Sequence, residues 1–137
     1  MMEKEIFFTI IMPTYNSERT IEKALKSIRD QKFDQNQIEI LVIDGGSTDR
    51  TIEIAERFGA VIIPNEERVP EAAKRLGYQY AARKGYQYVI QMDADGQHDA
   101  CNIPVIYHRL LEKDVEGRCP DVVLASRFME GSTDFPV

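Results

Sequence analysis

The sequence lacks several features that would assign it to whole classes of protein. None of its runs approaches the ~20 apolar residues of a membrane span, and the start MMEKEIFF lacks the longer apolar core of a secretory signal. Its two cysteines, Cys101 and Cys119, are too few for a disulfide framework and lack a metal-ligand spacing, so we expect reduced thiols. It contains no repeat, low-complexity tract or Gly/Ser linker. These absences favour a cytoplasmic protein.

Basic residues are also scarce relative to acidic ones. The chain has 17 Lys and Arg against 23 Asp and Glu, a net charge of −6. Nucleic-acid binders neutralise phosphates with clustered Lys and Arg, so we expect no nucleic-acid partner and a small-molecule ligand instead. The length of 137 residues and the apolar content of 43% suit one compact domain, residues 1–137, with a core of its own.

Short apolar runs alternate with helical patterns along the chain. The first run ends at Pro13 and has the composition of a strand that is buried on both faces, which is typical of parallel sheets. Strands alternating with helices predict an α/β fold with a mostly parallel sheet, helices on both faces and right-handed crossovers. The expected strands are residues 6–12, 38–43, 60–63, 88–92 and 121–125, and the expected helices are residues 21–28, 52–58, 70–84 and 103–112.

Polar turns follow three of these expected strands, at residues 13–17, 44–49 and 93–99. In such sheets ligands lie outside the carboxyl ends of the strands, near the point where strand order reverses. The third turn carries two aspartates, Asp93 and Asp95. Mg²⁺ and Mn²⁺ are usually held by one or two carboxylates together with waters and substrate phosphates. We interpret this turn as a clamp for a metal-bound diphosphate.

The acidic turn has three other interpretations. Asp and Gly also form ordinary turns, in which the side chain bonds to nearby backbone. An EF-hand loop is excluded, because His98 and Pro104 occupy the positions of the required Gly and bidentate Glu. Residues 93–96 also resemble a haloacid-dehalogenase-type phosphatase, with one Asp as nucleophile and the other as acid/base. That family expects Thr or Val next, where Gln97 stands, and needs Lys and further acidic ligands far downstream, in a part of the chain that this sequence does not contain.

Four motifs occur in a fixed order: IMPTYN (11–16), VIDGGSTDRT (42–51), QMDADGQHD (91–99) and ASRF (125–128). With them the sequence resembles the nucleotide-binding half of a family 2 glycosyltransferase with the GT-A fold, over residues 6–131. The resemblance implies a Rossmann-like nucleotide-sugar-binding sheet and an inverting transfer from a UDP- or GDP-sugar that depends on Mn²⁺ or Mg²⁺. The third and fourth motifs are most similar to the polyprenyl-phosphate branch, typified by dolichyl-phosphate mannose synthase, so the expected acceptor is a lipid phosphate.

The resemblance also implies roles for residues in the first two motifs. Pro13, Tyr15 and Asp44 would line the base and ribose pocket of the donor. Asp44 at a strand end can accept from the imide of uracil or the amidine edge of guanine, while Tyr15 can pack its ring against the base. As the alternative, Tyr15 is a loop-packing aromatic and Asp44 forms the turn. Gly45 stands where many members have a second Asp.

A basic residue directed at the donor is expected on the helix after Pro70. Arg75 falls at this position, with Lys74 as a neighbouring alternative. The sequence departs from the family here, because residues 67–70 replace the usual Gly-rich segment. A solvated helix face is therefore an equal interpretation of Arg75.

In the acidic turn, the resemblance implies that Asp95 is the principal metal ligand, that Asp93 reaches the ribose or the metal, and that Gln97 is a further ligand. Arg127 would face the acceptor or donor phosphates, with a surface salt bridge as the alternative. His98 is more typical of a surface group, or of one that supports a metal ligand, than of a general acid or base.

The sequence ends soon after the last motif, so we expect the acceptor half, with its catalytic base, to be absent and this piece to bind donor without transfer. Two further hypotheses stay open: a non-catalytic nucleotide-sugar-binding module, and a scaffold that uses the fold alone. A sheet edge exposed near the last strand would favour a homodimer. A longer protein of the polyprenyl branch would be membrane-associated.

Overall fold

The computed structural model describes residues 5–92 and 100–125. The chain divides into two compact units, residues 1–87 and residues 88–137, and each is described by itself. The single domain expected over residues 1–137 stays a prediction.

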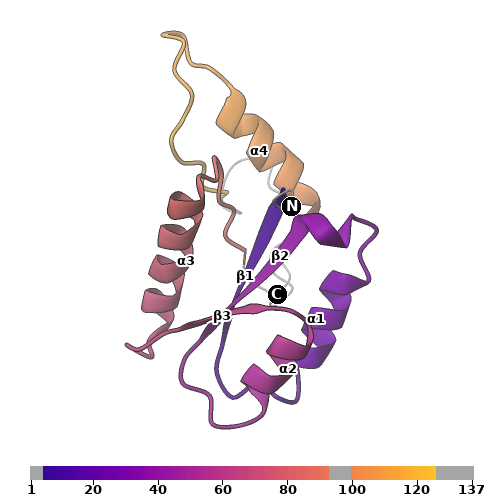
Figure 1. Cartoon of the computed structure of the whole chain (residues 1–137). Helices are drawn as coiled ribbons and strands as arrows, with labels where there is room; N and C mark the ends of the chain where they lie inside the picture. Colours follow the sequence, from indigo (N-terminus) through magenta and orange to yellow (C-terminus); the bar gives the residue numbers. More distant parts are fainter. Residues whose placement is uncertain (1–4, 93–99, 126–137) are drawn as a thin grey trace, which may run out of the picture. The chain divides into compact units, whose positions relative to one another are not determined.

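A three-stranded parallel sheet forms the centre of the first unit, with the strands in the order β1-β2-β3 (Figure 1). Helix α3 covers one face of this sheet, and helices α1 and α2 cover the other. The elements in chain order are β1 (Phe8–Thr14), α1 (Ile21–Arg29), the 3-10 turn η1 (Gln35–Gln37), β2 (Ile38–Asp44), α2 (Thr51–Arg57), β3 (Val61–Pro64) and α3 (Pro70–Lys84).

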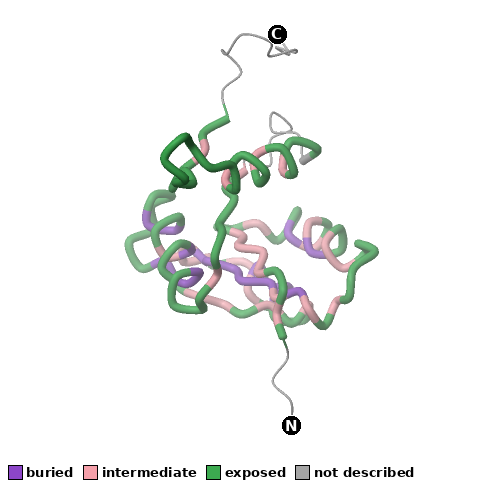
Figure 2. Tube along the Cα trace, turned by 90° about the horizontal axis from the view of Figure 1, so that it is seen from above, coloured by how far each residue is buried: buried purple, intermediate pink, exposed green. Residues whose placement is uncertain are grey.

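Strand β2 supplies most of the core, because its side chains point alternately to the two faces of the sheet. Ile40 and Val42 pack in the cluster that contains the apolar side of α1 and α2, and Leu41 and Ile43 pack in the cluster that contains α3. All four are at most 1% exposed. Figure 2 shows this strand as the longest buried stretch of the trace. Each such side chain contributes about 1.5–3 kcal/mol of hydrophobic stabilisation.

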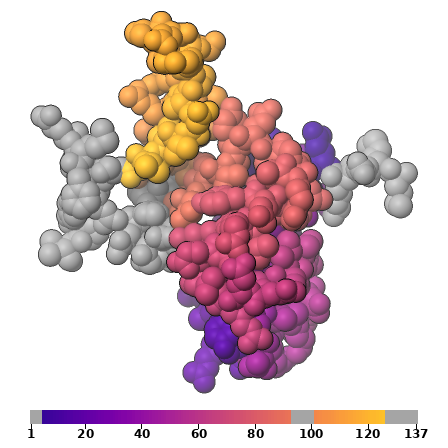
Figure 3. All heavy atoms as spheres, turned by 90° about the vertical axis from the view of Figure 1, so that its left-hand side faces the viewer, coloured from indigo at the N-terminus to yellow at the C-terminus, as the bar shows by residue number. Residues whose placement is uncertain are grey.

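Helix α3 has the bounds that the sequence predicts, Pro70–Lys84. Pro70 suits the first turn because its missing N–H would have no intrahelical partner there, and Gly85 ends the helix with a left-handed φ of 77°. Gly77 lets the helix approach the sheet closely, since a methyl group built there would lie 3.2 Å from Cγ2 of Ile11. Figure 3 looks onto the face of this unit that α3 covers.

The first expected strand differs from the structure in two respects. Pro13 does not end it but lies inside β1, paired with Ile43. Among the described strands β1 pairs only with β2, and an edge strand tolerates proline because the missing N–H can fall on the unpaired side. For the same reason β1 is mostly half-buried, and the expectation of burial on both faces is wrong for this strand.

The described part of the second unit contains a short 3-10 turn, η2 (Ala100–Asn102), and helix α4 (Ile103–Leu111). The strands expected at residues 88–92 and 121–125 are wrong, because these residues are in no strand. An apolar run signals a tendency to be buried, but a strand also needs a neighbour for its backbone hydrogen bonds. Neither run has one in the described structure, and Val89 and Leu124 are 46% and 84% exposed.

Cys101 and Cys119 are both exposed and form no disulfide, in agreement with the expected reduced thiols. Within the described residues, every helix is too short or too polar to cross a bilayer.

Candidate functional site

The candidate site lies at the carboxyl edge of the sheet in the first unit. Thr14, Asp44 and Pro64 are paired across the three strands at this edge. Because the strands are parallel, the loops that follow them all leave from the same side of the sheet. The described structure thus brings together the first two of the three polar turns that the sequence singles out.

Asp44 is 4% exposed and is bound by the turn that follows it. Its Oδ2 accepts the backbone N–H groups of Gly46 (3.0 Å) and Ser47 (2.9 Å), and its Oδ1 accepts the Ser47 hydroxyl. These three bonds satisfy the buried carboxylate. Asp44 therefore acts as the anchor of the turn Gly45–Ser47, which is the alternative to base binding that the sequence offers.

The loop after β1 is joined to the loop after β2 through Asn16. Its backbone N–H donates to Oγ of Ser47 at 2.8 Å, and its side-chain Oδ1 accepts the N–H of Thr48 at 2.8 Å. Asn16 has a left-handed φ of 43°, which Asn tolerates better than most residues. Gly45 adds a third link by donating its N–H to the Thr14 carbonyl at 2.8 Å.

Asp49 and Thr51 extend the same connection. The N–H of Ser17 donates to the hydroxyl of the fully buried Thr51 at 2.7 Å, and Thr51 donates to Asp49 through both its N–H and its hydroxyl. The second oxygen of Asp49 accepts the N–H of Glu18. Partial desolvation acts to raise the pKa of Asp49, but the hydrogen bonds from Thr51 and Glu18 outweigh it and hold the pKa below its usual range.

Tyr15 and Pro13 remain on the surface beside these bonded loops. Tyr15 is 61% exposed, and its Cβ and the ring carbon Cδ2 lie beside Gly45. A methyl group built at Gly45 would make ordinary contacts, 3.4 Å from the Thr14 carbonyl and 3.5 Å from Cβ of Tyr15. The backbone there can therefore carry a side chain, consistent with the second Asp that many members have at this position.

The segment after β3 completes the edge of the sheet. Asn65 is 5% exposed, donates its N–H to the Asp44 carbonyl at 2.7 Å and donates its side-chain amide to the Val69 carbonyl at 2.9 Å. Arg68 follows with a left-handed φ of 57°. Its guanidinium lies over Gly46, whose missing side chain leaves the space.

Arg75, the expected donor-binding residue of α3, forms an exposed ion pair with Glu67. Glu67 belongs to the segment that replaces the family's Gly-rich sequence, so this departure also supplies a partner for Arg75. The neighbouring alternative, Lys74, is exposed on the same helix.

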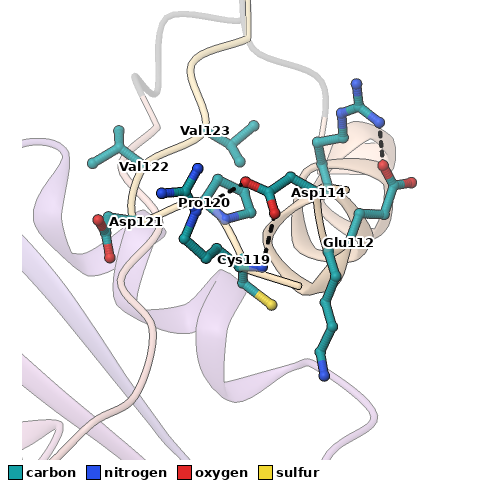
Figure 4. Close-up of a pocket in the computed structure, with 10 residues that line it drawn as sticks. Glu112, Asp114, Cys119, Pro120, Asp121, Val122 and Val123 are labelled. Carbon is teal, nitrogen blue, oxygen red and sulfur yellow. Dashed lines mark hydrogen bonds and ion pairs between the residues drawn. The ribbon is translucent and has the colours of Figure 1, made fainter. Parts of the chain in front are cut away.

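The second unit has a surface hollow of its own, formed by the end of α4 and residues 112–123 (Figure 4). Asp114 accepts the backbone N–H groups of Glu116 and Arg118 and the Arg118 side chain, and the backbone bond from Arg118 is the main cause that lowers the pKa of Asp114. Arg118 also pairs with Glu116, and Arg109 with Glu112. These charged side chains are thus paired with one another, and the pairs stabilise the loop that forms the hollow. A structural role for them is favoured over a catalytic one.

The sequence profile of the family described as Glycosyl transferase family 2 matches residues 9–130. The chain belongs to glycosyl transferase family 2. This match, with the parallel sheet covered by helices on both faces, confirms the predicted GT-A type of α/β fold.

Curated proteins that are similar in sequence include a glycosyltransferase and a polyprenol monophosphomannose synthase. The chain is 33% identical to Glycosyltransferase AglJ of Haloferax volcanii over 122 residues, which cover 88% of this chain and 36% of that protein. It is 30% identical to the polyprenol monophosphomannose synthase of Mycolicibacterium smegmatis over 132 residues, 90% of this chain and 46% of the relative. The chain thus spans less than half the length of either relative.

A solved structure of similar sequence is a mannosyltransferase from Pyrobaculum calidifontis in complex with GDP-Man and Mn²⁺. The two chains are 28% identical, and the superposition has a TM-score of 0.48 and covers 53% of this chain and 24% of the other.

Several predicted site residues lie outside the described residues. They are Asp93, Asp95 and Gln97 of the acidic turn, the neighbouring His98, and Arg127. Their roles as metal, ribose and phosphate ligands in this glycosyltransferase chain stay predictions.

Sequence reasoning missed the residues that hold the site of this family 2 chain together. Asn16, Ser47 and Thr51 stood inside the quoted motifs, and the Asp-x-Thr pattern at residues 49–51 is a known local signal for backbone capping. Arg68 carried no such signal, because its place over Gly46 depends on a contact between distant parts of the chain.

Proposed function

We propose that this chain is the donor-binding part of a metal-dependent, inverting glycosyltransferase that moves a sugar from a nucleotide-diphosphate donor to a polyprenyl phosphate. The observation that carries the proposal is the bonded pair of loops at the carboxyl edge of the sheet, within a chain matched by the family over residues 9–130. Such loops offer a rigid surface before ligand arrives, which reduces the entropy lost on binding.

The base pocket is proposed to consist of Pro13, Tyr15 and Asp44. Asp44 already accepts three hydrogen bonds from its own turn. A carboxylate has about four acceptor positions, so one is left for an imide or amidine N–H of the base. The exposed ring of Tyr15 supplies a flat apolar face beside it. In this arrangement Asp44 holds the turn and contacts the donor at the same time.

Arg75 is proposed to exchange partners when donor binds. Its pair with Glu67 is about half exposed on both sides, and such surface pairs contribute only ~0–1 kcal/mol. A diphosphate offers a stronger bidentate partner for a guanidinium than a solvated carboxylate does. The ion pair would therefore break at little cost.

Asp95, Asp93 and Gln97 are proposed to hold Mn²⁺ or Mg²⁺, since their oxygen atoms are the ligands these hard cations prefer. A bound cation would supply Lewis-acid stabilisation of the charge on the departing nucleoside diphosphate. The acceptor is proposed to be a lipid phosphate contacted by Arg127. A phosphate oxygen is already an anionic nucleophile and needs little help from a general base.

Calorimetric titration of the chain with UDP and with GDP, each in Mn²⁺ and in EDTA, tests this function. We expect one nucleotide to bind and its affinity to collapse in EDTA. Asp44→Ala should weaken binding in both conditions, and Asp95→Asn should remove only the metal-dependent part. Asp30→Asn, at the far end of α1, is the matched control and should bind like the unsubstituted chain. Failure of the intact chain to bind either nucleotide would contradict the proposal.

A further inference from the structure

Arg68 is held in a fixed place by the segment between β3 and α3. Its N–H donates to the Asn65 carbonyl at 3.1 Å, while Asn65 itself donates to the carbonyl of Asp44. Asn65 also fixes the start of α3 through its bond to the Val69 carbonyl. The backbone of Arg68 is therefore tied to the ends of both β2 and β3.

The backbone conformation of Arg68 is one that few side-chain-bearing residues adopt. Its φ of 57° lies in the left-handed region, which glycine occupies without steric cost. Asn16, the other described non-glycine residue in this region, has a local explanation because its side chain bonds to the adjoining loop. Arg68 makes no comparable bond, and strained residues of this kind cluster at ligand sites.

The Arg68 guanidinium lies directly over the turn that Asp44 anchors. A methyl group built at Gly46 would be 3.0 Å from its Nε, 3.3 Å from its Cζ and 3.5 Å from one terminal nitrogen. The N–H groups of Gly46, Ser47 and Thr48 are already used inside the loops. The guanidinium is thus the group at this turn that still offers donors to a ligand.

The charge of Arg68 is uncompensated within the described residues. Arg68 is exposed and has no ion pair with any described residue. The exposed residues Arg19, Arg57 and Arg83 share this property, but Arg68 is the one whose guanidinium lies over the Gly46 turn. Glu67, its neighbour in sequence, is paired with Arg75. A fixed, unpaired cation at a ligand-binding edge favours an anionic ligand.

Two buried oxygens without a hydrogen-bond partner lie at the same edge. They are Oγ1 of Thr14, at the end of β1, and Oδ1 of Asn65, just after β3. Buried polar atoms are nearly always bonded, so each exception calls for an explanation. Both exceptions among the described residues flank Asp44, which marks this edge as incomplete without a ligand or an ordered water.

We propose that Arg68 binds the diphosphate of the nucleotide donor, beside the Gly45–Ser47 turn. Its planar fork of N–H donors matches phosphate oxygens and can form two parallel bonds to them. The proposal rests on the proposed function, because it names the residue that recognises the diphosphate of that donor. Arg68 would be a second cation at the donor site beside Arg75. Arg75 is held by an ion pair with Glu67, whereas the backbone of Arg68 is held by its hydrogen bond to Asn65.

The experiment compares a nucleoside diphosphate with its nucleoside. The intact chain, Arg68→Gln and the control Arg57→Gln are titrated with UDP and uridine, and with GDP and guanosine. Arg57 is an exposed arginine in the last turn of helix α2. We expect Arg68→Gln to weaken diphosphate binding about 10- to 100-fold, the range for charge-assisted hydrogen bonds, and to leave nucleoside binding unchanged. Arg57→Gln should alter neither.

Arg68→Gly separates binding from a structural role. Glycine suits the left-handed conformation, so the Tm of this variant should equal or exceed that of the intact chain while its diphosphate affinity falls. A purely structural Arg68 would lower Tm when replaced. If the intact chain binds UDP or GDP and both Arg68 variants bind it equally well, the inference is overturned. If the intact chain binds no nucleotide, the proposed function itself fails.

Discussion

Gly46 combines a left-handed backbone with a close contact from a side chain that is distant in the sequence. Its φ is +90°, and a Cβ there would come within 3.0 Å of Nε of Arg68. The neighbouring Gly45 has no such conformation, and a Cβ there meets only ordinary contacts. Gly45→Ala and Gly46→Ala therefore form a matched pair, one residue apart in the same turn.

The expected cost of Gly46→Ala follows from its backbone. A left-handed conformation costs an L-residue about 1–2 kcal/mol, and the reduced entropy of the unfolded chain returns about 0.4–1 kcal/mol. At the midpoints of these ranges the net loss of unfolding free energy is about 0.8 kcal/mol, a fall in Tm of roughly 2–4 °C for a chain of this size. Gly45→Ala gains the same entropy term without the conformational cost, so it should be neutral or up to about 1 kcal/mol more stable than the unsubstituted chain.

Urea unfolding followed by circular dichroism measures both variants. The dependence of unfolding free energy on urea should be the same for all three chains, so that the midpoints report stability directly. Gly46→Ala should also weaken nucleoside diphosphate binding, because its methyl group displaces the Arg68 guanidinium. Equal stability of the two variants would refute the assigned conformation of the turn.

Two further predictions concern the bonds between the loops. At residue 16, the free energy of unfolding should fall in the order Asn, Gly, Ala. Asn16→Gly keeps the left-handed backbone but loses the hydrogen bond to Thr48, which costs about 0.5–1.5 kcal/mol of stability. Asn16→Ala loses the same bond and also bears the conformational cost of about 1–2 kcal/mol. Asn16→Asp keeps the acceptor, so its urea midpoint should be higher than that of Asn16→Ala. An equal or lower midpoint for Asn16→Asp would contradict this assignment. At Asp49 the pKa is lower in the folded chain, so its contribution to stability is present above the unfolded pKa of about 3.9 and is lost as pH falls through the folded value. The stability deficit of Asp49→Asn should therefore be largest above about pH 4 and shrink at lower pH, and a deficit that does not change with pH would exclude the ionised carboxylate as its cause.

The parts of the fold that local sequence determines agree with the prediction. Strand β2 is an apolar run with polar ends, and α3 has proline at its start and glycine after its end, so their positions could be predicted closely. Residues 88–92 have the same apolar composition as β2 but form no strand in the described structure. Composition does not specify a pairing partner, because pairing depends on residues far away in the sequence.

The candidate site also has some features that local sequence determines and others that depend on contacts between distant residues. Asp44 and Tyr15 could be named from their motifs, since polar residues at the carboxyl end of a parallel strand face the ligand side of the sheet. That Asp44 is bound by its own turn is a local feature, which the sequence already offered as an alternative to base binding. That Asn16 joins the two loops depends on a bond between residues 32 positions apart. Arg68 could not be recognised from the sequence, because its neighbour Gly46 lies more than 20 positions before it.

The central claim is that nucleotide binds at the carboxyl edge of the sheet in the first unit. The most direct measurement is an amide NMR titration of the chain with the preferred nucleoside diphosphate and Mg²⁺. The account predicts shifts at Tyr15, Gly45–Ser47 and Arg68, with little change at the far ends of α1 and α3. Shifts confined to residues 109–123, around the hollow of the second unit, would contradict it.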